Sequence, residues 1–351
     1  MTYSGAREGK FIPNHTGILC VGMMDSAMKL YWILLGLVVI GCKQSPRFYT
    51  NAFRADIRVQ LYDEHKYDFL WCLDNSGSMA SRRTFIRDNI QKFIGIMNTR
   101  KAVDYQMAVV TTDFFNDGGA LVPGPSGKTV VKSTDSDPVG DFAAIVGNIR
   151  GSKTDFWEQC LESVYQAVYQ HRGEFSRTGV PLNVIIVSDE NDWSCKDDCW
   201  GEQPETNTNW KPWPVERYSQ YLANVKSSEN SEINIFPIVG LDDEQCAVAS
   251  LGSRYTDVAS AVGSLSVSGS ICNSQFKESY EAIARVIADR GVRFPLDRPS
   301  DGRGISVFVD RVLVPYGDDG WVFEPETNSI VFMGRIPSKN SVVVITYSES
   351  S

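Results

Sequence analysis

Histidine is scarce in this sequence, because the 351 residues include only three: His15, His65 and His171. Zinc centres and Ser-His-Asp triads both depend on histidine side chains. His171 lies near the expected end of a helix, where a surface or capping role is favoured over catalysis. The scarcity therefore argues against zinc chemistry and against a histidine-based triad.

Sequence motifs of serine hydrolases and nucleotide-binding proteins are missing as well, and so is the basic character of a nucleic-acid-binding protein. The chain contains no Gly-x-Ser-x-Gly elbow, no P-loop and no Gly-x-Gly-x-x-Gly motif. No block rich in lysine and arginine appears, and the formal net charge is −9. Since a nucleic-acid-binding protein usually presents a basic face, the sequence predicts no nucleic-acid partner. A negative charge instead suits solubility and cation binding.

The apolar run at residues 30–40 is too short to cross a bilayer, which takes about 20 residues. It follows Lys29 and ends in Gly41-Cys42. This arrangement resembles a bacterial lipoprotein signal, in which a small residue precedes the cysteine. The resemblance implies cleavage before Cys42 and attachment of the protein to a membrane through lipid on that cysteine. The alternative is an uncleaved anchor or a buried apolar segment.

Residues 1–41 are expected to form a signal or leader region. Met28 followed by Lys29 makes a better start than Met1, so we hypothesise that translation begins at Met28, or at Met23 or Met24. Lys43 replaces the aspartate that marks retention in the inner membrane of some bacteria. The lipoprotein resemblance therefore favours the outer membrane over the inner membrane of a bacterial cell envelope.

Six further cysteines fit an oxidising compartment and allow fifteen pairings. Cys72 and Cys160 fall in an expected strand and helix, so they either pair or remain buried thiols. A zinc site is the alternative, although a Cys-x-x-x-Cys spacing without histidine partners indicates one only weakly. The remaining possible disulfides join Cys195 to Cys199 and Cys246 to Cys272.

Strand and helix signals alternate between residues 67 and 291. Residues 67–73 form a nearly continuous apolar run, typical of a strand covered on both faces. Further strands are expected at 105–112, 182–188 and 233–239, and helices at 82–100, 142–149, 156–171, 215–226 and 276–288. The alternation predicts an α/β domain with a doubly wound, mostly parallel sheet flanked by helices. Ligands of such sheets bind at the carboxyl ends of the strands.

The segments on either side of residues 67–291 have a different character. Residues 42–66 are polar and mixed, and we interpret them as the lipidated N-terminus, a tether and an entry strand. Helix signals stop after residue 291, and short strands separated by turns follow. Residues 292–351 are therefore expected to form a small C-terminal all-β module.

The chemistry is concentrated where the first core strand ends, in the hexapeptide Asp74-Asn75-Ser76-Gly77-Ser78-Met79. The carboxylate and the two hydroxyl groups are hard oxygen donors of the kind that Mg²⁺ prefers. Gly77 is expected to permit the backbone bend. The alternative for this stretch alone is a Ser/Gly-rich helix cap.

Two other loops are expected to supply oxygen atoms to the same sheet edge. Asp189 follows the third core strand, and Thr154 precedes the helix expected at 156–171, with Ser152 as its competitor. Asp155 and Glu158 fit a capping box for that helix.

The hexapeptide resembles the Asp-x-Ser-x-Ser signature of von Willebrand factor A (VWA) domains, the metal-ion-dependent adhesion site. The resemblance covers roughly residues 67–291, and the family has a doubly wound fold. It implies that Ser76 and Ser78 bind Mg²⁺ (or Mn²⁺ or Ca²⁺) directly and that Thr154 is the third-loop hydroxyl. Asp74 and Asp189 would hold the cation, often through water.

A function follows from the charge of such a site. Two neutral hydroxyl groups leave the cation poorly neutralised, so it can accept a carboxylate from an Asp or Glu of a protein partner. The sequence therefore predicts a cell-envelope lipoprotein that mediates protein binding or adhesion and is not an enzyme. The alternatives are a metal-assisted hydrolase with Asp189, Glu190 or Asp192 as the base, or a scaffold with a vacant metal site.

Overall fold

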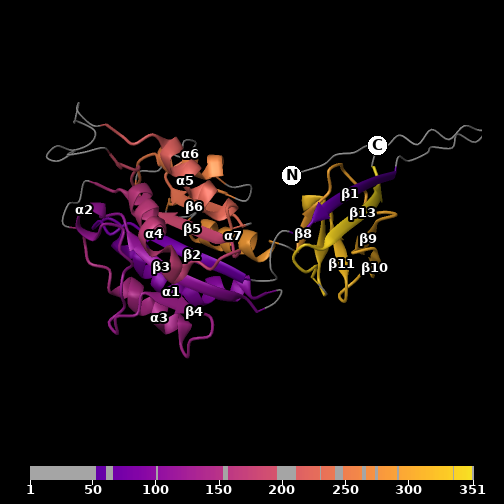
Figure 1. The fold of residues 1–351 in the computed structure, drawn as a ribbon, viewed down its shortest axis with the longest axis horizontal. Helices are drawn as coiled ribbons and strands as arrows, with labels where there is room; N and C mark the ends of the chain where they lie inside the picture. The colour runs from indigo at the N-terminus through magenta and orange to yellow at the C-terminus, as the bar shows by residue number, and fades with distance from the viewer. Residues whose placement is uncertain are drawn as a thin grey trace, which may run out of the picture.

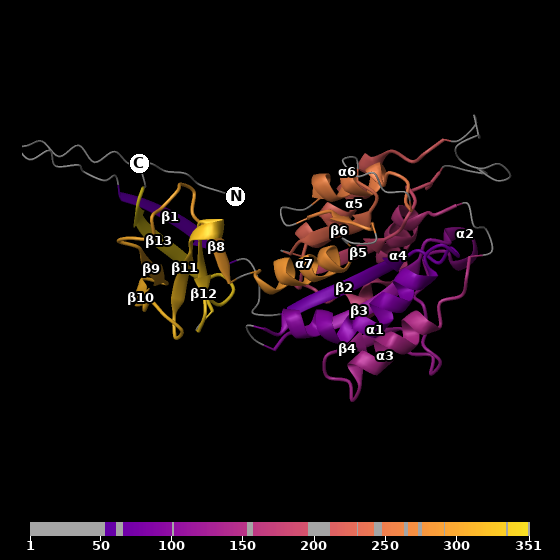
Figure 2. The same ribbon diagram turned by 180° about the vertical axis from the view of Figure 1, so that it is seen from behind.

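The computed structural model describes residues 53–60, 66–99, 102–152, 157–195, 211–229, 231–241, 248–262, 266–272, 276–290, 292–334 and 336–349. These residues form two units (Figures 1 and 2). We call residues 66–290 the mixed-sheet unit, after its six-stranded sheet. We call residues 53–60 together with 292–349 the β module.

The sheet of the mixed-sheet unit has the strand order β4-β3-β2-β5-β6-β7. Its strands are β2 (Lys66–Leu73), β3 (Asp104–Thr111), β4 (Val130–Lys132), β5 (Leu182–Val187), β6 (Ile233–Val239) and β7 (Gly269–Ser270). Neighbouring strands pair parallel except for β4, which runs antiparallel to β3 at one edge. Strands β5 and β6 are buried along their whole length, which explains their nearly continuous apolar sequence.

Helices cover both faces of this sheet. They are α1 (Ala80–Met97), α2 (Phe114–Asp117), α3 (Pro138–Gly147), α4 (Cys160–Phe175), α5 (Val215–Ser227), α6 (Ser253–Val262) and α7 (Phe276–Ala288). One apolar core lies between the sheet and α1, α3 and α7, and the other lies between the sheet and α4, α5 and α6. In the first core the indole ring of Trp71 packs edge-on against Phe93 at 5.2 Å and Phe142 at 5.5 Å.

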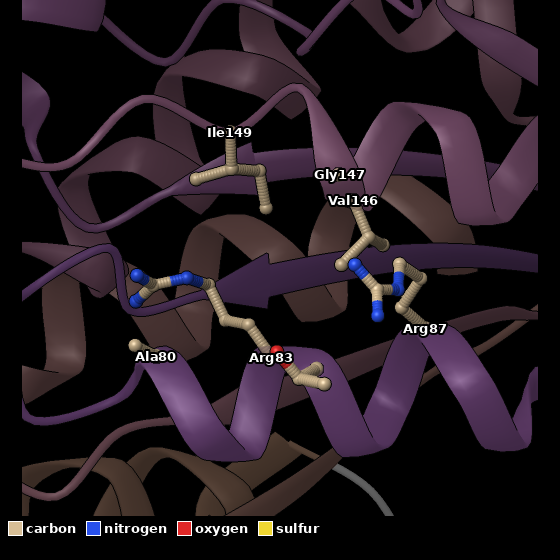
Figure 3. Close-up of a pocket in the computed structure, with 7 residues that line it drawn as sticks. Ala80, Arg83, Arg87, Val146, Gly147 and Ile149 are labelled. Atoms are coloured by element: carbon tan, nitrogen blue, oxygen red, sulfur yellow. The ribbon is translucent and has the colours of Figure 1, made fainter.

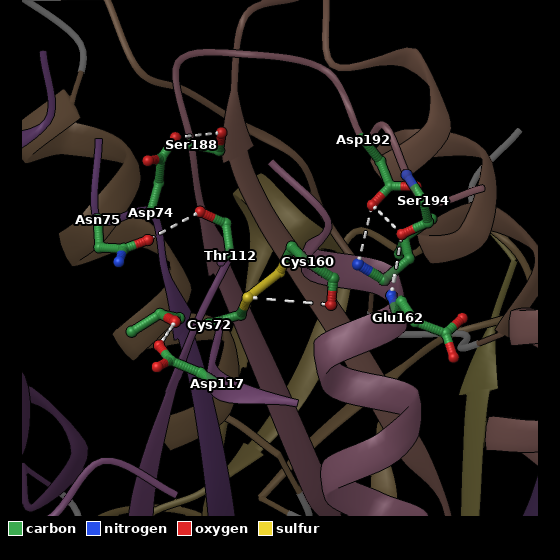
Figure 4. The surroundings of a disulfide bond; sticks show 12 residues. Cys72, Asp74, Asn75, Thr112, Asp117, Cys160, Glu162, Ser188, Asp192 and Ser194 are labelled. Carbon is green, nitrogen blue, oxygen red and sulfur yellow. Dashed lines mark hydrogen bonds between the residues drawn. A yellow bond between two sulfur atoms is a disulfide. The ribbon is translucent and has the colours of Figure 1, made fainter. Parts of the chain in front are cut away.

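A disulfide bond crosses the second core between Cys72 on β2 and Cys160 on α4 (Figure 4). The Cα atoms of the two residues are 6.2 Å apart, and both side chains are fully buried. Of the two possibilities that the sequence left open for these cysteines, pairing is the one found. The bond connects the carboxyl end of β2 to the first residue of α4.

The β module contains two antiparallel sheets. The first has the order β1-β13-β9-β10, and the second has the order β11-β12-β8. The strands are β1 (Phe53–Val59), β8 (Arg293–Pro295), β9 (Ser306–Val309), β10 (Val312–Val314), β11 (Trp321–Glu324), β12 (Ser329–Phe332) and β13 (Val342–Ser348), with the 3-10 helix η1 (Pro325–Thr327). Seven residues of β1 pair with β13, so strands from the two ends of the described chain lie side by side (Figure 1).

Side chains that alternate along the strands form the core of the β module. The inner face of β13 contributes Val343, Ile345 and Tyr347, all fully buried, while the residues between them are at least partly exposed. The β9–β10 hairpin turns through Asp310 and Arg311, which both have positive φ. This is the backbone geometry of the tight turns that suit the twist of paired strands.

The prediction of a doubly wound, mostly parallel sheet with a small C-terminal all-β module is wrong. The described strands form three sheets, and eight of the thirteen strands make only antiparallel pairs. The largest sheet is itself mixed, because β4 is antiparallel. The β module is not C-terminal either, since β1 belongs to it. Local apolar patterns identify strands but do not show which strands pair over long sequence distances.

The expected start of the helix at 156–171 is also wrong. Helix α4 begins at Cys160, and its N-cap is Gln159, which makes no side-chain capping hydrogen bond. Glu158 therefore lies before the helix and cannot complete a capping box. The amide groups of Leu161 and Glu162 are instead satisfied by Asp192 Oδ1 at 3.0 Å and Ser194 Oγ at 3.1 Å.

Among the described residues, no helix is both long and apolar enough to span a bilayer. Cys42 and the apolar run that precedes it lie outside the described residues. The lipid attachment expected from the sequence therefore stays a prediction.

Candidate metal-binding site

The candidate site lies at the carboxyl ends of two neighbouring strands. Strands β2 and β5 are parallel and in register, with Leu73 opposite Val187. Asp74 follows β2, and Ser188 and Asp189 follow β5, so the sheet brings the two aspartates to the same edge. The backbone amide of Asp74 donates to the carbonyl oxygen of Val187 at 3.0 Å, which continues the ladder up to the site.

Asp74 is fully buried and holds the turn that follows it. Its Oδ1 accepts a hydrogen bond from the amide of Ser76 at 2.8 Å. Its Oδ2 accepts one from the hydroxyl of Ser188 at 2.7 Å (Figure 4). Burial raises the pKa of Asp74, hydrogen bonds from Ser188 and Ser76 oppose the increase, and the charge of Asp189 adds to it. Asp74 therefore orients the turn through both of its carboxyl oxygens.

The hydroxyl groups of Ser76 and Ser78 face each other, with their oxygen atoms 3.0 Å apart. Two neighbouring ligands of an octahedral Mg²⁺ ion, each at about 2.1 Å, lie about 2.9–3.0 Å apart. The spacing of the two hydroxyl groups therefore fits one edge of a magnesium coordination shell. Ser76 is buried and Ser78 is exposed, so the pair opens to solvent on one side.

The turn owes its shape to hydrogen bonds more than to glycine. Gly77 does not have a positive φ, and a Cβ atom there would meet nothing within 4 Å. The expectation that Gly77 permits the bend is therefore wrong. Instead, Nη1 of Arg83 donates to the carbonyl oxygens of Asp74 at 2.6 Å and of Ser76 at 2.8 Å.

Asp189 keeps one carboxyl oxygen free of hydrogen bonds, although only 5% of its surface is exposed. That oxygen, Oδ1, is buried and has no partner. Burial raises the pKa of Asp189, while a hydrogen bond from Ser78 and the charge of Arg82 lower it less strongly. A buried carboxyl oxygen without a donor is costly unless a proton or a cation satisfies it.

Four of the five expected metal ligands can be placed, and the structure brings Asp74, Ser76, Ser78 and Asp189 together at this edge. Thr154 lies outside the described residues. Its competitor Ser152 is at the same edge, where its amide donates to the carbonyl of Asn75 at 3.0 Å. The hydroxyl of Ser152 donates to Asp113 Oδ2 at 3.3 Å.

Glu158 was not expected at this site, yet it lies there with only 2% of its surface exposed. Its side chain interacts with the carboxyl group of Glu190, and its Oε2 atom has no hydrogen-bond donor. Burial, followed by the charges of Asp74 and Glu190, raises the pKa of Glu158 to about 10. Burial raises the pKa of Glu190 as well. The available sequence signal was an acidic residue just before the apolar stripe of α4.

Asp192 is engaged in structural contacts. It is fully buried, caps α4 through its Oδ1, and forms an ion pair with Arg254 at 3.2 Å through its Oδ2. A carboxylate held in this way has no oxygen free to take a proton from water. The structure therefore removes Asp192 from the candidate bases of a hydrolase.

Carboxyl groups alone do not make a metal centre here. Within the described parts of the chain, no group of three or more His, Cys, Asp or Glu side chains has the arrangement to hold a metal ion. The donor set that fits Mg²⁺ combines the two serine hydroxyl groups with the carboxyl groups beside them.

Of the other expected disulfide cysteines, Cys195 and Cys272 are disulfide-bonded. Cys199 and Cys246, with which they were expected to pair, lie outside the described residues.

A pocket of about 190 Å³ lies beside the site, between the start of α1 and the end of α3 (Figure 3). Arg83 and Arg87 line it, one turn apart on α1, together with Ala80, Thr84, Val146, Gly147 and Ile149. The same Arg83 holds the carbonyl groups of the serine turn. A positively charged pocket therefore adjoins the candidate site.

No protein-family model matches the chain, and no curated protein sequence matches it. Among solved structures, the chain is similar to the pilus adhesin SpaC from Lactobacillus rhamnosus GG in its open conformation, with a TM-score of 0.41 and 12% identity. The match covers 84% of this chain and 40% of SpaC, so the chain spans about two fifths of that protein.

Two further solved structures are similar to the chain. The adhesive tip pilin GBS104 from Group B Streptococcus agalactiae matches with a TM-score of 0.39 and 10% identity, over 85% of this chain and 82% of the pilin. Proximal thread matrix protein 1 from the mussel byssus matches with a TM-score of 0.37 and 14% identity, over 67% and 48% of the two chains. Similarities at these scores carry no conclusion about function.

Proposed function

We propose that this protein is a cell-envelope lipoprotein that holds a divalent cation at a VWA-type metal-ion-dependent adhesion site and thereby binds partner proteins. The cation is Mg²⁺, or Mn²⁺ or Ca²⁺ in its place. The observation that carries the proposal is the serine pair, because the hydroxyl oxygens of Ser76 and Ser78 are 3.0 Å apart beside two buried aspartates.

The electrostatics of the site support a cation. Asp74 and Asp189 are both buried, burial raises the pKa of each, and the charge of Asp189 adds to the rise for Asp74. A divalent ion between the loops would neutralise both charges and satisfy the free oxygen of Asp189. Oxygen donors of this kind suit hard cations such as Mg²⁺ and Ca²⁺.

The exposed side of the site supports a carboxylate ligand from a partner. Ser78 and Gly77 are exposed, and the space over Gly77 is open. Arg83 and Arg87 add positive charge in the neighbouring pocket. An Asp or Glu of a partner protein would meet the cation at the opening, with these arginines close by.

Lipid attachment at Cys42 would keep this binding at a bacterial membrane, with the outer membrane favoured over the inner one. The support is the sequence pattern that ends in Gly41-Cys42. The first described strand begins at Phe53, eleven residues after the proposed lipid site. Growth with a radiolabelled fatty acid would label the wild-type protein but not Cys42→Ala if the attachment is correct.

The cation is tested with Mn²⁺ as the probe and its electron paramagnetic resonance signal as the readout. We expect the wild-type protein to bind Mn²⁺ and Ser76→Ala/Ser78→Ala to bind it at least about tenfold more weakly. Ser81→Ala, on the first turn of α1, is the matched control. Equal binding by the wild type and the double variant would contradict the proposal.

The open coordination position is tested with acetate, the simplest carboxylate. Bound Mn²⁺ with an exchangeable water increases the relaxation rate of water protons, and acetate should lower that increase by displacing the water. A wild-type complex that shows no response to acetate would mean that the cation has no position for a partner.

A further inference from the structure

A row of apolar side chains crosses the four-stranded sheet of the β module. Ile57 on β1 lies opposite Val344 on β13. Val344 lies opposite Phe308 on β9, and Phe308 lies opposite Leu313 on β10. Residues directly opposite each other in antiparallel strands share one face of the sheet. The row therefore spans all four neighbouring strands, β1, β13, β9 and β10 (Figures 1 and 2).

This row points away from the core of the β module. Ile57 is 60% exposed and Leu313 is 61% exposed, whereas Val343, on the opposite face of β13, is fully buried. Beside the row, Val59 lies opposite Val342, and both are exposed. The six apolar residues on this side of the sheet, which we call the outer apolar face, are Ile57, Val59, Phe308, Leu313, Val342 and Val344.

No charged side chain interrupts the outer apolar face on the described strands. The next row on the same side is uncharged and consists of Ala55, Thr346 and Ser306. The two arginines of β1 alternate with the exposed apolar residues and are paired, Arg54 with Glu349 and Arg58 with Asp297. Single exposed apolar side chains are common, but a contiguous uncharged patch is typical of an interaction surface.

The position of β1 in the chain indicates what lies against this face. Strand β1 begins at Phe53, eleven residues after Cys42. Eleven residues reach at most about 40 Å, and four strands side by side are only about 15 Å across. A lipid on Cys42 would therefore keep the whole outer apolar face within reach of a bilayer. Lys43 and Arg47 in the connecting segment add positive charge, which favours anionic lipid headgroups.

We propose that the outer apolar face lies against the lipid bilayer in which the lipid on Cys42 is inserted. The inference rests on the lipid attachment in the proposed function and adds a second membrane contact to it. The attached lipid raises the local concentration of the face at the bilayer, so a face too small to bind alone can bind there.

The direction of the row favours a bilayer over a second protein chain. A strand added by another chain would pair with the backbone at an edge of the sheet, along β1 or β10. The apolar row instead runs across the strands, from one edge of the sheet to the other. A broad, uncharged face of this kind suits the apolar layer just below the headgroups.

The test uses the full-length protein, purified from bacterial membranes and reconstituted into vesicles of phosphatidylethanolamine and phosphatidylglycerol. The vesicles also contain a phospholipid with a photoreactive acyl chain, and mass spectrometry identifies the peptides that it labels. We expect peptides containing Ile57 and Leu313 to be labelled at least about tenfold more than the peptide containing Tyr169. Tyr169 is the matched reference, because it is 69% exposed on α4 of the mixed-sheet unit.

Two variants test whether the apolar side chains cause the contact. Ile57→Asp/Leu313→Asp should lose the labelling of the face, because a carboxylate is costly to bring into the apolar layer. Ile57→Ser/Leu313→Ser should reduce the labelling less. Tyr169→Asp is the control and should leave the labelling of the face at the wild-type level. Circular dichroism checks the fold of each variant, and if the aspartate variant does not fold, the serine variant and the wild-type comparison decide.

Equal labelling of the Ile57, Leu313 and Tyr169 peptides, in a protein that carries a fatty acid on Cys42, would overturn the inference and leave the proposed lipid attachment in place. A wild-type protein without a fatty acid would overturn both. Protein-to-protein cross-links at Leu313 in place of lipid labelling would also overturn the inference, because a second copy would then cover the face. Mn²⁺ binding at the serine pair is measured separately and does not depend on any of these results.

Discussion

Asp56 in the β module and Asp189 in the mixed-sheet unit are buried to the same degree, with 6% and 5% of their surface exposed. The two carboxyl groups have different surroundings. Asp56 Oδ2 accepts the amide of Asp297 at 2.8 Å and the hydroxyl of Tyr347 at 3.1 Å. Asp189 Oδ1 has no donor at all. The carboxyl group of Asp56 stabilises the fold of the β module, whereas that of Asp189 keeps one oxygen without a hydrogen-bond donor.

The same contrast holds for the two units as wholes. Within the described residues of the β module, no buried side-chain nitrogen or oxygen lacks a partner. The mixed-sheet unit leaves such atoms at several places, and two of them are carboxyl oxygens, on Glu158 and Asp189. Native proteins satisfy nearly all buried polar groups, so a buried carboxyl oxygen without a donor calls for a proton or a cation.

The largest expected effect comes from removing the Cys72–Cys160 disulfide, and the disulfide-bonded cysteines of the described chain all lie in the mixed-sheet unit. Cys72→Ala/Cys160→Ala opens a loop with a sequence separation of 88 residues. We expect the free energy of unfolding of that unit to fall by about 4–5 kcal/mol. Hydrogen exchange measured by mass spectrometry should show faster exchange in β5 and unchanged exchange in β13. Equal acceleration in both strands would mean that the two units unfold together.

The next effect concerns pH in the absence of metal. The raised pKa values of Glu158 and Asp74 mean that the unfolded chain loses these protons first, so stability falls as pH rises above about 4.5 towards about 10. Each such group can contribute at most about 1.4 kcal/mol per pH unit. Urea unfolding at pH 5, 6 and 7 should show this decline, and a saturating divalent cation should reverse it. Glu158→Gln should reduce the slope, and an unchanged slope would mean that the pKa of Glu158 is not raised in the folded protein.

A smaller effect is expected where the β module satisfies its buried carboxyl group. Tyr347→Phe removes the hydroxyl that donates to Asp56 and accepts the amide of Arg298 at 3.1 Å. We expect a loss of about 1–2 kcal/mol in the stability of the β module. Tyr169→Phe is the control, because Tyr169 is 69% exposed. If both variants melted like the wild type, the hydrogen bonds of Asp56 would contribute nothing to the fold.

The smallest effect is expected on the outer face of the β module. Leu313 on β10 is 61% exposed and lies opposite Phe308 in the sheet. Leu313→Ser should change the free energy of unfolding by no more than about 0.5 kcal/mol. A larger decrease in melting temperature, measured by differential scanning fluorimetry, would show that Leu313 is covered in the folded protein.

Much of the mixed-sheet unit could be predicted from local patterns. Helix α7 spans the residues expected for it, and β6 does as well, because each has an uninterrupted apolar signal with clear ends. Helix α6 was not predicted, since its short apolar stripe is mixed with serine and aspartate. The pairing of β1 with β13 could not be predicted, because a local sequence pattern does not indicate which distant strand a given strand pairs with.

The site was predicted in part for the same reason. Asp74, Ser76 and Ser78 form one short motif after β2, and Asp189 lies just after β5, so the pairing of these two strands brings them together. Glu158 could not be placed, because its position depends on where α4 begins. That beginning is set by Asp192 and Ser194, whose side chains accept the first amides of the helix from a distant loop.

The pairing of β1 with β13 also sets an order of events when the chain is made. The mixed-sheet unit lies wholly between these strands, so a ribosome or a secretion channel releases all of it before β13 emerges. The mixed-sheet unit can therefore fold before β13 has been synthesised. During that time β1, the first of the described strands to be made, has no strand to pair with. The β module is completed last, and each newly made molecule carries an unpaired β1 until synthesis reaches residue 348.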